Sequence, residues 1–255
     1  MLRSRVIPCL LLRHGGLVKT RKFARPKYVG DPINAIRIFN EKEVDELVVL
    51  DIEASKEGRE PDYALVEQFA AECFMPLCYG GGVSTLDQAR RLFALGVEKV
   101  SVQTAALRSL DLISRMAVQF GSQSVVASID IKIDWLGRRR LYSASAAKFH
   151  AVGWQDYLAQ VERAGAGEIF LTAVDRDGEM TGMDLALIRD VTSLVRIPVI
   201  AAGGVGSLTD IVGGLDNGAS AVAAGAFFIY HGPHRAVLIT YPSRSEIDQV
   251  LGFRA

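Results

Sequence analysis

The chain has 255 residues, and its 29 basic and 29 acidic side chains give a formal net charge of zero. That balance gives no support for binding nucleic acid or a membrane through bulk electrostatics, and the apolar run Val6–Leu12 is far too short to span a bilayer. Three cysteines without a CxxC pair indicate reduced thiols, not a disulfide framework or a zinc site, so we expect a cytoplasmic protein.

Apolar runs alternate with helical patterns along the whole chain. The predicted strands are Arg5–Leu12, Glu46–Asp51, Pro76–Tyr79, Lys99–Val102, Ser124–Asp130, Glu168–Ala173, Pro198–Ala202 and Ser220–Ala224. The predicted helices begin at Asp31-Pro32 and at Pro61, follow the third strand, and cover about Leu110–Gln119, Gly153–Ala164, Asp184–Leu194, Leu208–Asn217 and Ser243–Leu251. This order predicts one α/β unit over residues 1–255, a (βα)₈ TIM barrel with its active site at the C-terminal ends of the strands.

Two connections stand out from this alternation. Residues 13–30 form a polar segment, which we interpret as a loop, either solvated or acting as a lid over an anionic substrate; it carries the cations Lys19, Arg21, Lys22, Arg25 and Lys27. Ile131–Ser145 has alternating apolar residues about Leu136-Gly137, which predicts a β-hairpin inserted in a top loop. No spacing of the four histidines indicates a metal site, and we expect no cofactor.

A long repeat organises the chain. Pro76–Leu107 aligns without a gap on Pro198–Ile229, 122 positions later, so that Gly81 falls on Gly203 and Gly82 on Gly204. We therefore expect two half-barrels, about 1–120 and 121–255. A glycine turn between a strand and a helix aims backbone N–H groups at an anion, although either turn alone could be only a tight connection. Two such turns in register predict a substrate with a phosphate at each end.

Several motifs together resemble a known family. RVIPCL (5–10), GDP (30–32), GGGV (80–83), GAGEIFLTAVDRDG (165–178) and AAGGVG (201–206) are similar to HisF, the cyclase subunit of imidazole glycerol phosphate synthase. The resemblance implies a pair of aspartates acting as general acid and base at the ends of the first and fifth strands. The second matches Asp130, but Leu11 stands at the first position and has no titratable group.

The same resemblance implies further site residues. The phosphate-binding positions would be Gly82, Gln103 and Thr104 in the first half, and Asp177, Gly178, Gly204, Gly225 and Ala226 in the second, beside Gly81 and Gly203. Lys19 matches the family's loop lysine, although a lone loop lysine is more often solvated. A ring of charges gating the entry of ammonia would be Arg5, Glu46, Lys99 and Glu168, with Glu98 and Gln123 at a glutaminase interface.

A chain that keeps the charged gate but lacks the first aspartate resembles the WbuZ-like HisF paralogues. Three motifs are also similar to that group: CLLL (9–12), GLVKT (16–20) and YVGDPINA (28–35). These imply a HisH-like glutaminase partner, a separate ATP-using amidotransferase, and conversion of an acetamido sugar to its acetamidino form in surface polysaccharide synthesis. The ligand would be a phosphorylated or nucleotide-linked small molecule. Two alternatives stay open: a histidine-pathway cyclase with altered acid and base residues, and a non-catalytic scaffold that activates a glutaminase.

Overall fold

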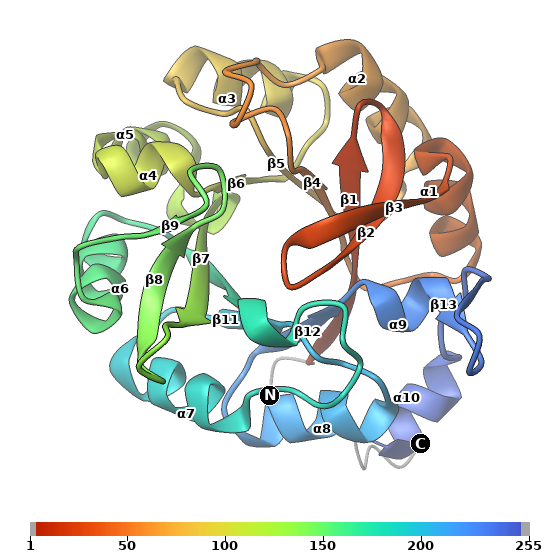
Figure 1. The fold of residues 1–255 in the computed structure, drawn as a ribbon. Helices are drawn as coiled ribbons and strands as arrows, with labels where there is room; N and C mark the ends of the chain where they lie inside the picture. The colour runs from red at the N-terminus through yellow and green to blue at the C-terminus, as the bar shows by residue number, and fades with distance from the viewer. Residues whose placement is uncertain (1–3, 251–255) are drawn as a thin grey trace.

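The computed structural model describes residues 4–250, in which eight parallel strands close into a barrel surrounded by helices (Figure 1). The predicted α/β TIM-barrel fold is confirmed. In order around the barrel the strands are β1 (Arg5–Arg13), β4 (Leu47–Asp51), β5 (Leu77–Gly80), β6 (Lys99–Val102), β7 (Val125–Ile133), β10 (Glu168–Ala173), β11 (Val199–Ala202) and β12 (Ala221–Ala224). The pairing of β1 with β12 completes the ring.

The outer helices lie close to their predicted positions. They are α1 (Pro32–Glu41), α2 (Tyr63–Glu72), α3 (Leu86–Ala94), α5 (Asp111–Phe120), α6 (Trp154–Arg163), α7 (Leu185–Leu194), α8 (Leu208–Asp216) and α10 (Arg244–Val250). Asp31 caps α1 by accepting a hydrogen bond from the Asn34 amide at 2.9 Å, with Pro32 at the first position, as expected. The second helix begins two residues after Pro61, because Asp62 is its cap. Leu251, the predicted end of the last helix, lies outside the described residues.

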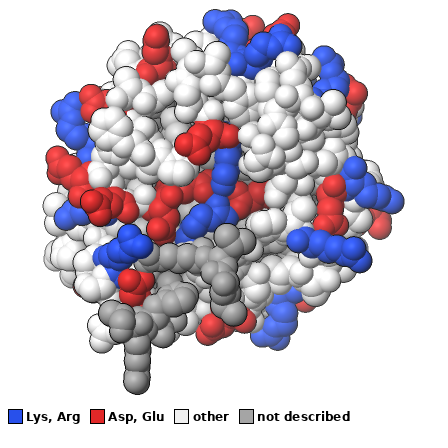
Figure 2. Space-filling view, turned by 180° about the vertical axis from the view of Figure 1, so that it is seen from behind, with Lys and Arg blue, Asp and Glu red and all other residues white. Residues whose placement is uncertain are grey.

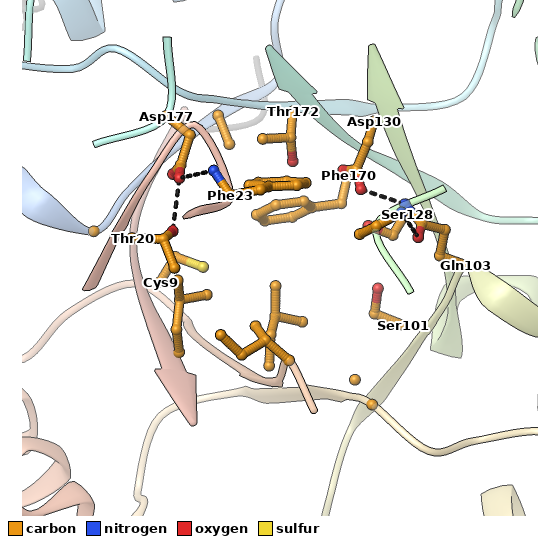
Figure 3. Close-up of a pocket in the computed structure, with 18 of the residues that line it drawn as sticks. Cys9, Thr20, Phe23, Ser101, Gln103, Ser128, Asp130, Phe170, Thr172 and Asp177 are labelled. Carbon is orange, nitrogen blue, oxygen red and sulfur yellow. Dashed lines mark hydrogen bonds between the residues drawn. The ribbon is translucent and has the colours of Figure 1, made fainter. Parts of the chain in front are cut away.

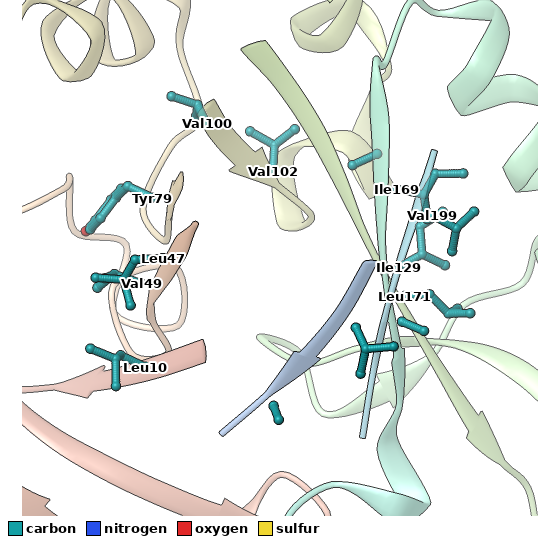
Figure 4. Close-up of a cluster of buried hydrophobic side chains, with 14 of the residues drawn as sticks. Leu10, Leu47, Val49, Tyr79, Val100, Val102, Ile129, Ile169, Leu171 and Val199 are labelled. Carbon is teal, nitrogen blue, oxygen red and sulfur yellow. The ribbon is translucent and has the colours of Figure 1, made fainter. Parts of the chain in front are cut away.

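Strand alternation divides the buried side chains into two layers. One layer packs between the strands and the helices and includes Leu10, Leu47, Val49, Tyr79 and Val100 (Figure 4). The other fills the middle of the barrel with Ile7, Val48, Cys78, Val126, Phe170, Ile200, Ala221 and Ala223. The barrel interior is therefore apolar between its two ends.

The prediction of a loop at residues 13–30 is wrong. This segment forms a β-hairpin of β2 (Gly16–Arg21) and β3 (Ala24–Gly30), and β2 extends the barrel by pairing antiparallel with β1. Lys22 and Phe23 connect the strands, and both have positive φ angles, 53° and 61°. A two-residue turn of this handedness usually contains glycine or asparagine, and neither residue is present to indicate a hairpin here.

The second predicted hairpin is confirmed: β7 continues past the barrel and pairs antiparallel with β8 (Arg139–Ser143), which is followed by β9 (Lys148–Phe149). Smaller elements were not predicted. They are α4 (Thr104–Arg108), α9 (Ala226–Ile229), the 3₁₀ turns η1 (Ser122–Ser124) and η2 (Val174–Arg176), and the short strands β13 (Tyr230–His231) and β14 (Ala236–Val237).

The repeat in the sequence is a repeat in the structure. β5, α3 and β6 have the same bounds as β11, α8 and β12 after a shift of 122 residues, and α4 and α9 begin at matching positions. Thr85 and Ser207 cap the matching helices α3 and α8 through their hydroxyl groups. Within residues 4–250, none of the helices has the length and apolar character needed to cross a membrane.

Candidate functional site

A cavity of about 190 Å³ lies at the C-terminal ends of the barrel strands (Figure 3). Both glycine turns line it, together with β1, β7 and the β2–β3 hairpin. The sequence placed a group of ligand-binding residues here, and all of them line this one cavity: Lys19, Gly81, Gly82, Gln103, Thr104, Asp177, Gly178, Gly203, Gly204, Gly225 and Ala226. Their placement agrees with the expectation.

Asp130 is the buried acid of the cavity. Its side chain lies on β7, and the residue is 4 % exposed. Burial raises its pKa to about 7, although hydrogen bonds from Gln103 and Thr172 favour the charged form. Figure 3 shows the bond from the Gln103 amide to the Asp130 carboxylate. A carboxyl group with such a pKa can both donate and accept a proton near neutral pH.

Leu11 lines the same cavity from β1. Since β1 and β7 are four strands apart in a ring of eight, Leu11 and Asp130 lie on opposite sides of the barrel. Asp175, which follows β10, does not line the cavity; its carboxylate accepts a hydrogen bond from the Ile133 amide at 2.7 Å. It orients the hairpin instead. Leu11 therefore gives Asp130 no acidic partner on β1. The other acids that line the cavity are Asp51, at the end of β4, and Asp177, whose charge adds to the rise in the pKa of Asp130.

The first glycine turn is held by hydroxyl groups. The Gly82 amide donates to Ser55 Oγ at 3.1 Å, and Thr104 Oγ1 donates to Ser145 Oγ at 3.0 Å. The Gln103 side chain is directed to Asp130, so its amide is not available to a phosphate on this turn. Gly82 has a φ angle of +73°, and a Cβ there would lie 2.6 Å from the Arg59 carbonyl oxygen, so only glycine fits.

A buried cation lies beside Gly225, which directly follows β12. Lys19 is 6 % exposed, which excludes the solvated position considered for it, and its Nζ donates to the Cys9 carbonyl at 2.5 Å. Burial lowers the pKa of Lys19, while Asp177 favours its charged form. A Cβ at Gly225 would collide with Lys19 Nζ, so this glycine makes room for the cation. Ala226 offers no hydroxyl group here.

Asp177 fastens the β2–β3 hairpin over the cavity. Its carboxylate accepts hydrogen bonds from Thr20 Oγ1 at 2.7 Å and from the Phe23 amide at 3.4 Å, as Figure 3 shows. Its carbonyl accepts from the Lys22 amide at 2.9 Å. Burial raises the pKa of Asp177. The hydrogen bonds from Thr20 and Phe23 and the positive charge of Lys19 oppose this rise. Sequence reasoning missed Thr20 and Phe23 because it missed the hairpin that carries them.

Four charged side chains form a closed ring at the opposite end of the barrel. Arg5 contacts Glu46 at 2.5 Å and also contacts Glu168, while Lys99 contacts the same two carboxylates at 2.8 and 2.9 Å. The glutamates are buried, with side chains only 2 % and 6 % exposed. Burial alone would lower the pKa of Lys99, but the two carboxylates raise it above its ordinary value. Figure 2 shows charges of both signs gathered at the centre of this face.

The two predicted interface residues lie at the same end of the barrel. Glu98 directly precedes β6 and Gln123 lies in η1 just before β7, and both are exposed. They are therefore placed where the prediction requires. Within residues 4–250, no three histidine, cysteine or acidic side chains gather as metal ligands would.

Comparison with known proteins adds the family. The description "Histidine biosynthesis protein" matches residues 5–234. The chain is 55 % identical over 249 residues to "Putative imidazole glycerol phosphate synthase subunit hisF2" of Pseudomonas aeruginosa, covering 97 % of this chain and 99 % of that protein. It is 49 % identical to "Putative imidazole glycerol phosphate synthase subunit HisF" of Leptospira interrogans, with 96 % and 98 % covered. For "Putative imidazole glycerol phosphate synthase subunit hisF3" of Vibrio vulnificus the identity is 46 %, with 98 % and 97 % covered.

Proposed function

This chain belongs to the histidine biosynthesis protein family, and we propose that it is the HisF-like barrel subunit of a glutamine-dependent amidation system. It receives ammonia from a HisH-like glutaminase at the face that carries the charged ring. It delivers the ammonia for conversion of an acetamido sugar to the acetamidino form in surface polysaccharide synthesis, a step that also uses a separate ATP-dependent amidotransferase. The complex works in the cytoplasm.

One combination supports this proposal: the ring of Arg5, Glu46, Lys99 and Glu168 is intact, while Leu11 replaces one of the two acids that cyclase chemistry uses. The ring is neutral, and each cation contacts both carboxylates. Lys99 can therefore move from one carboxylate to the other without leaving a buried charge unpaired. A movable, neutral ring suits an entrance for a small neutral molecule.

The barrel interior supports the same route. Above the ring lies the apolar layer that includes Ile7, Val48 and Val126, and above that layer lies the cavity with Asp130. An ammonium ion would lose its hydration shell in such a layer without gaining a partner, whereas neutral ammonia crosses at much lower cost. The apolar middle of the barrel thus favours transfer of ammonia and excludes its charged form.

The cyclase alternative draws on the names of the relatives, which all contain imidazole glycerol phosphate synthase. Leu11 opposes it, because general acid and base catalysis needs a titratable group in reach of the reacting atoms. The scaffold alternative would explain why an aspartate is missing at position 11, but it gives no reason for keeping a buried ring of four charges. Burying such charges is costly unless they serve a purpose.

A turnover assay separates the cyclase from the amidation subunit. We expect the purified protein, supplied with the histidine-pathway substrate of the cyclase and ammonium salts, to form no product. A genuine cyclase assayed in parallel serves as the positive control. Turnover on the order of 1 s⁻¹ or more would rule out the proposal and establish the cyclase. Leu11→Asp is a useful companion variant, in which a trace of activity would show that the rest of the cavity still holds the substrate.

A further inference from the structure

A second hollow, of about 660 Å³, adjoins the cavity at the first glycine turn. The two share Ser55, Gly82, Val83 and Thr104, so they are continuous around that turn. The hollow, here called the outer groove, runs outward between the start of α3 and the junction of α4 with α5. A group bound on the Gly82 turn can therefore extend out of the barrel into the outer groove.

The walls of the outer groove carry hydrogen-bond donors. Ser84, Thr85 and Ser109 contribute hydroxyl groups, and Arg59, Arg108 and Arg115 contribute guanidinium groups. The lining also contains three acids, Glu60, Asp87 and Asp111. Each of these already contacts an arginine: Glu60 lies 3.7 Å from Arg91, Asp111 lies 3.5 Å from Arg115, and Asp87 contacts Arg90.

Arg108 is the uncommitted cation of the outer groove. It ends α4 and is exposed, and its side chain makes no hydrogen bond or ion pair with any residue between 4 and 250. A guanidinium group with no protein partner, next to a glycine turn and several hydroxyl groups, is well suited to bind a phosphate oxygen. Leu86 and Leu112 also line the groove and offer apolar contact to a flat ring.

The second glycine turn also has arginines near it. There Arg235 lies over the Gly178–Glu179 segment and donates to the carbonyl oxygens of both residues, at 3.1 and 3.0 Å. Glu179 also contacts Arg21 of the hairpin at 2.5 Å. These two arginines are engaged in holding the protein together. Arg176, whose Cβ adjoins Gly204, is exposed and has no side-chain partner within residues 4–250. What sets the first turn apart is therefore the outer groove that runs from it.

We propose that the outer groove binds the nucleoside diphosphate end of a nucleotide-linked substrate. One phosphate lies on the Gly82 turn, the next contacts Arg108, and the nucleoside occupies the remaining length of the groove. The volume of the groove lies within the usual range for a site that holds a molecule of this size. The inference rests on the proposed function in one respect only: it names the substrate class of that subunit as nucleotide-linked.

Titration calorimetry tests it with uridine, guanosine and adenosine diphosphate and with inorganic phosphate. We expect at least one nucleoside diphosphate to bind about tenfold more tightly than phosphate. Arg108→Ala should weaken that binding about tenfold while leaving phosphate binding unchanged. Arg163→Ala is the matched control, since Arg163 is an exposed arginine on α6 that bonds only to the Ala159 carbonyl.

Two results would overturn the inference. One is equal affinity for phosphate and all three nucleoside diphosphates; the other is an Arg108→Ala variant that binds the preferred nucleotide as tightly as the wild type. Ammonia transfer does not enter this titration. The protein could therefore fail to bind nucleotides and still couple to a glutaminase, or bind nucleotides without such coupling. The two proposals are thus tested separately.

Discussion

Asp130 is the residue whose chemistry is most altered by its surroundings. It is buried, its pKa is raised to about 7, and an apolar side chain stands at the position opposite. In the unfolded chain the same carboxyl group loses its proton near the ordinary aspartate pKa of 3.8. Between these two values the folded state holds more protons than the unfolded state. The free energy of unfolding therefore falls as pH rises through this window.

Asp130→Asn isolates this effect, because asparagine has the same shape and no charge. At pH 4 the variant and the wild type should have nearly equal stability. As pH rises to 8 the wild type should lose up to about 4 kcal/mol relative to the variant. Urea unfolding at a series of pH values measures this difference. Parallel stability curves for the two proteins would show that Asp130 ionises normally.

Single residues also show what a sequence can reveal about a site. Every glycine and polar residue that the repeat and the resemblance assigned to the cavity is found there, because a glycine turn fixes its own position relative to its strand. The direction of a side chain is harder to foresee. Gln103 was expected to bind phosphate, but its side chain bonds to Asp130, a residue 27 positions away that only the closed barrel brings near.

The β2–β3 hairpin is the element that lies over the cavity (Figure 1). It carries Lys19 and Phe23 into the lining, and its tip is held by Asp177. The positive φ angles at Lys22 and Phe23 cost energy that these contacts offset. The sequence could not show this element, since β3 is exposed along most of its length and lacks alternating apolar residues. Barrel strands, which are buried, were predicted to within a few residues.

Thr20→Val should loosen the hairpin. The substitution keeps the volume of the side chain but removes the hydroxyl group that donates to Asp177, a bond of 2.7 Å to a buried carboxylate. We expect the local stability of β2 and β3 to fall by about 1–2 kcal/mol. Amide hydrogen exchange in these strands measures the change. Thr181→Val, at an exposed site, is the control, and equal exchange in both variants would contradict the role of the bond.

At the scale of the whole molecule, three parts lie along the barrel axis: a charged ring, an apolar layer and the cavity that contains Asp130. The twofold repeat accounts for the two glycine turns, and it places them on the same face. The ring lies at the other end, on the face that also carries Glu98 and Gln123. This order suits a protein that accepts ammonia at one face and releases it at the other.

The central claim is that ammonia enters through the ring, and Lys99→Ala tests it in the system reconstituted with the glutaminase and the amidotransferase. The change leaves Glu46 and Glu168 with Arg5 alone, so it should cost about 3 kcal/mol or more, and folding is checked first by circular dichroism. Lys99→Arg keeps the charge and is the control.

The measurement is the amount of amidated product formed for each glutamine hydrolysed. In the wild type and in Lys99→Arg this ratio should be close to one, because ammonia stays inside the complex. In Lys99→Ala we expect the ratio to fall several-fold, while added ammonium salt restores product formation by bypassing the ring. A folded Lys99→Ala protein whose ratio equals that of the wild type would contradict the claim that the ring is the entrance for ammonia.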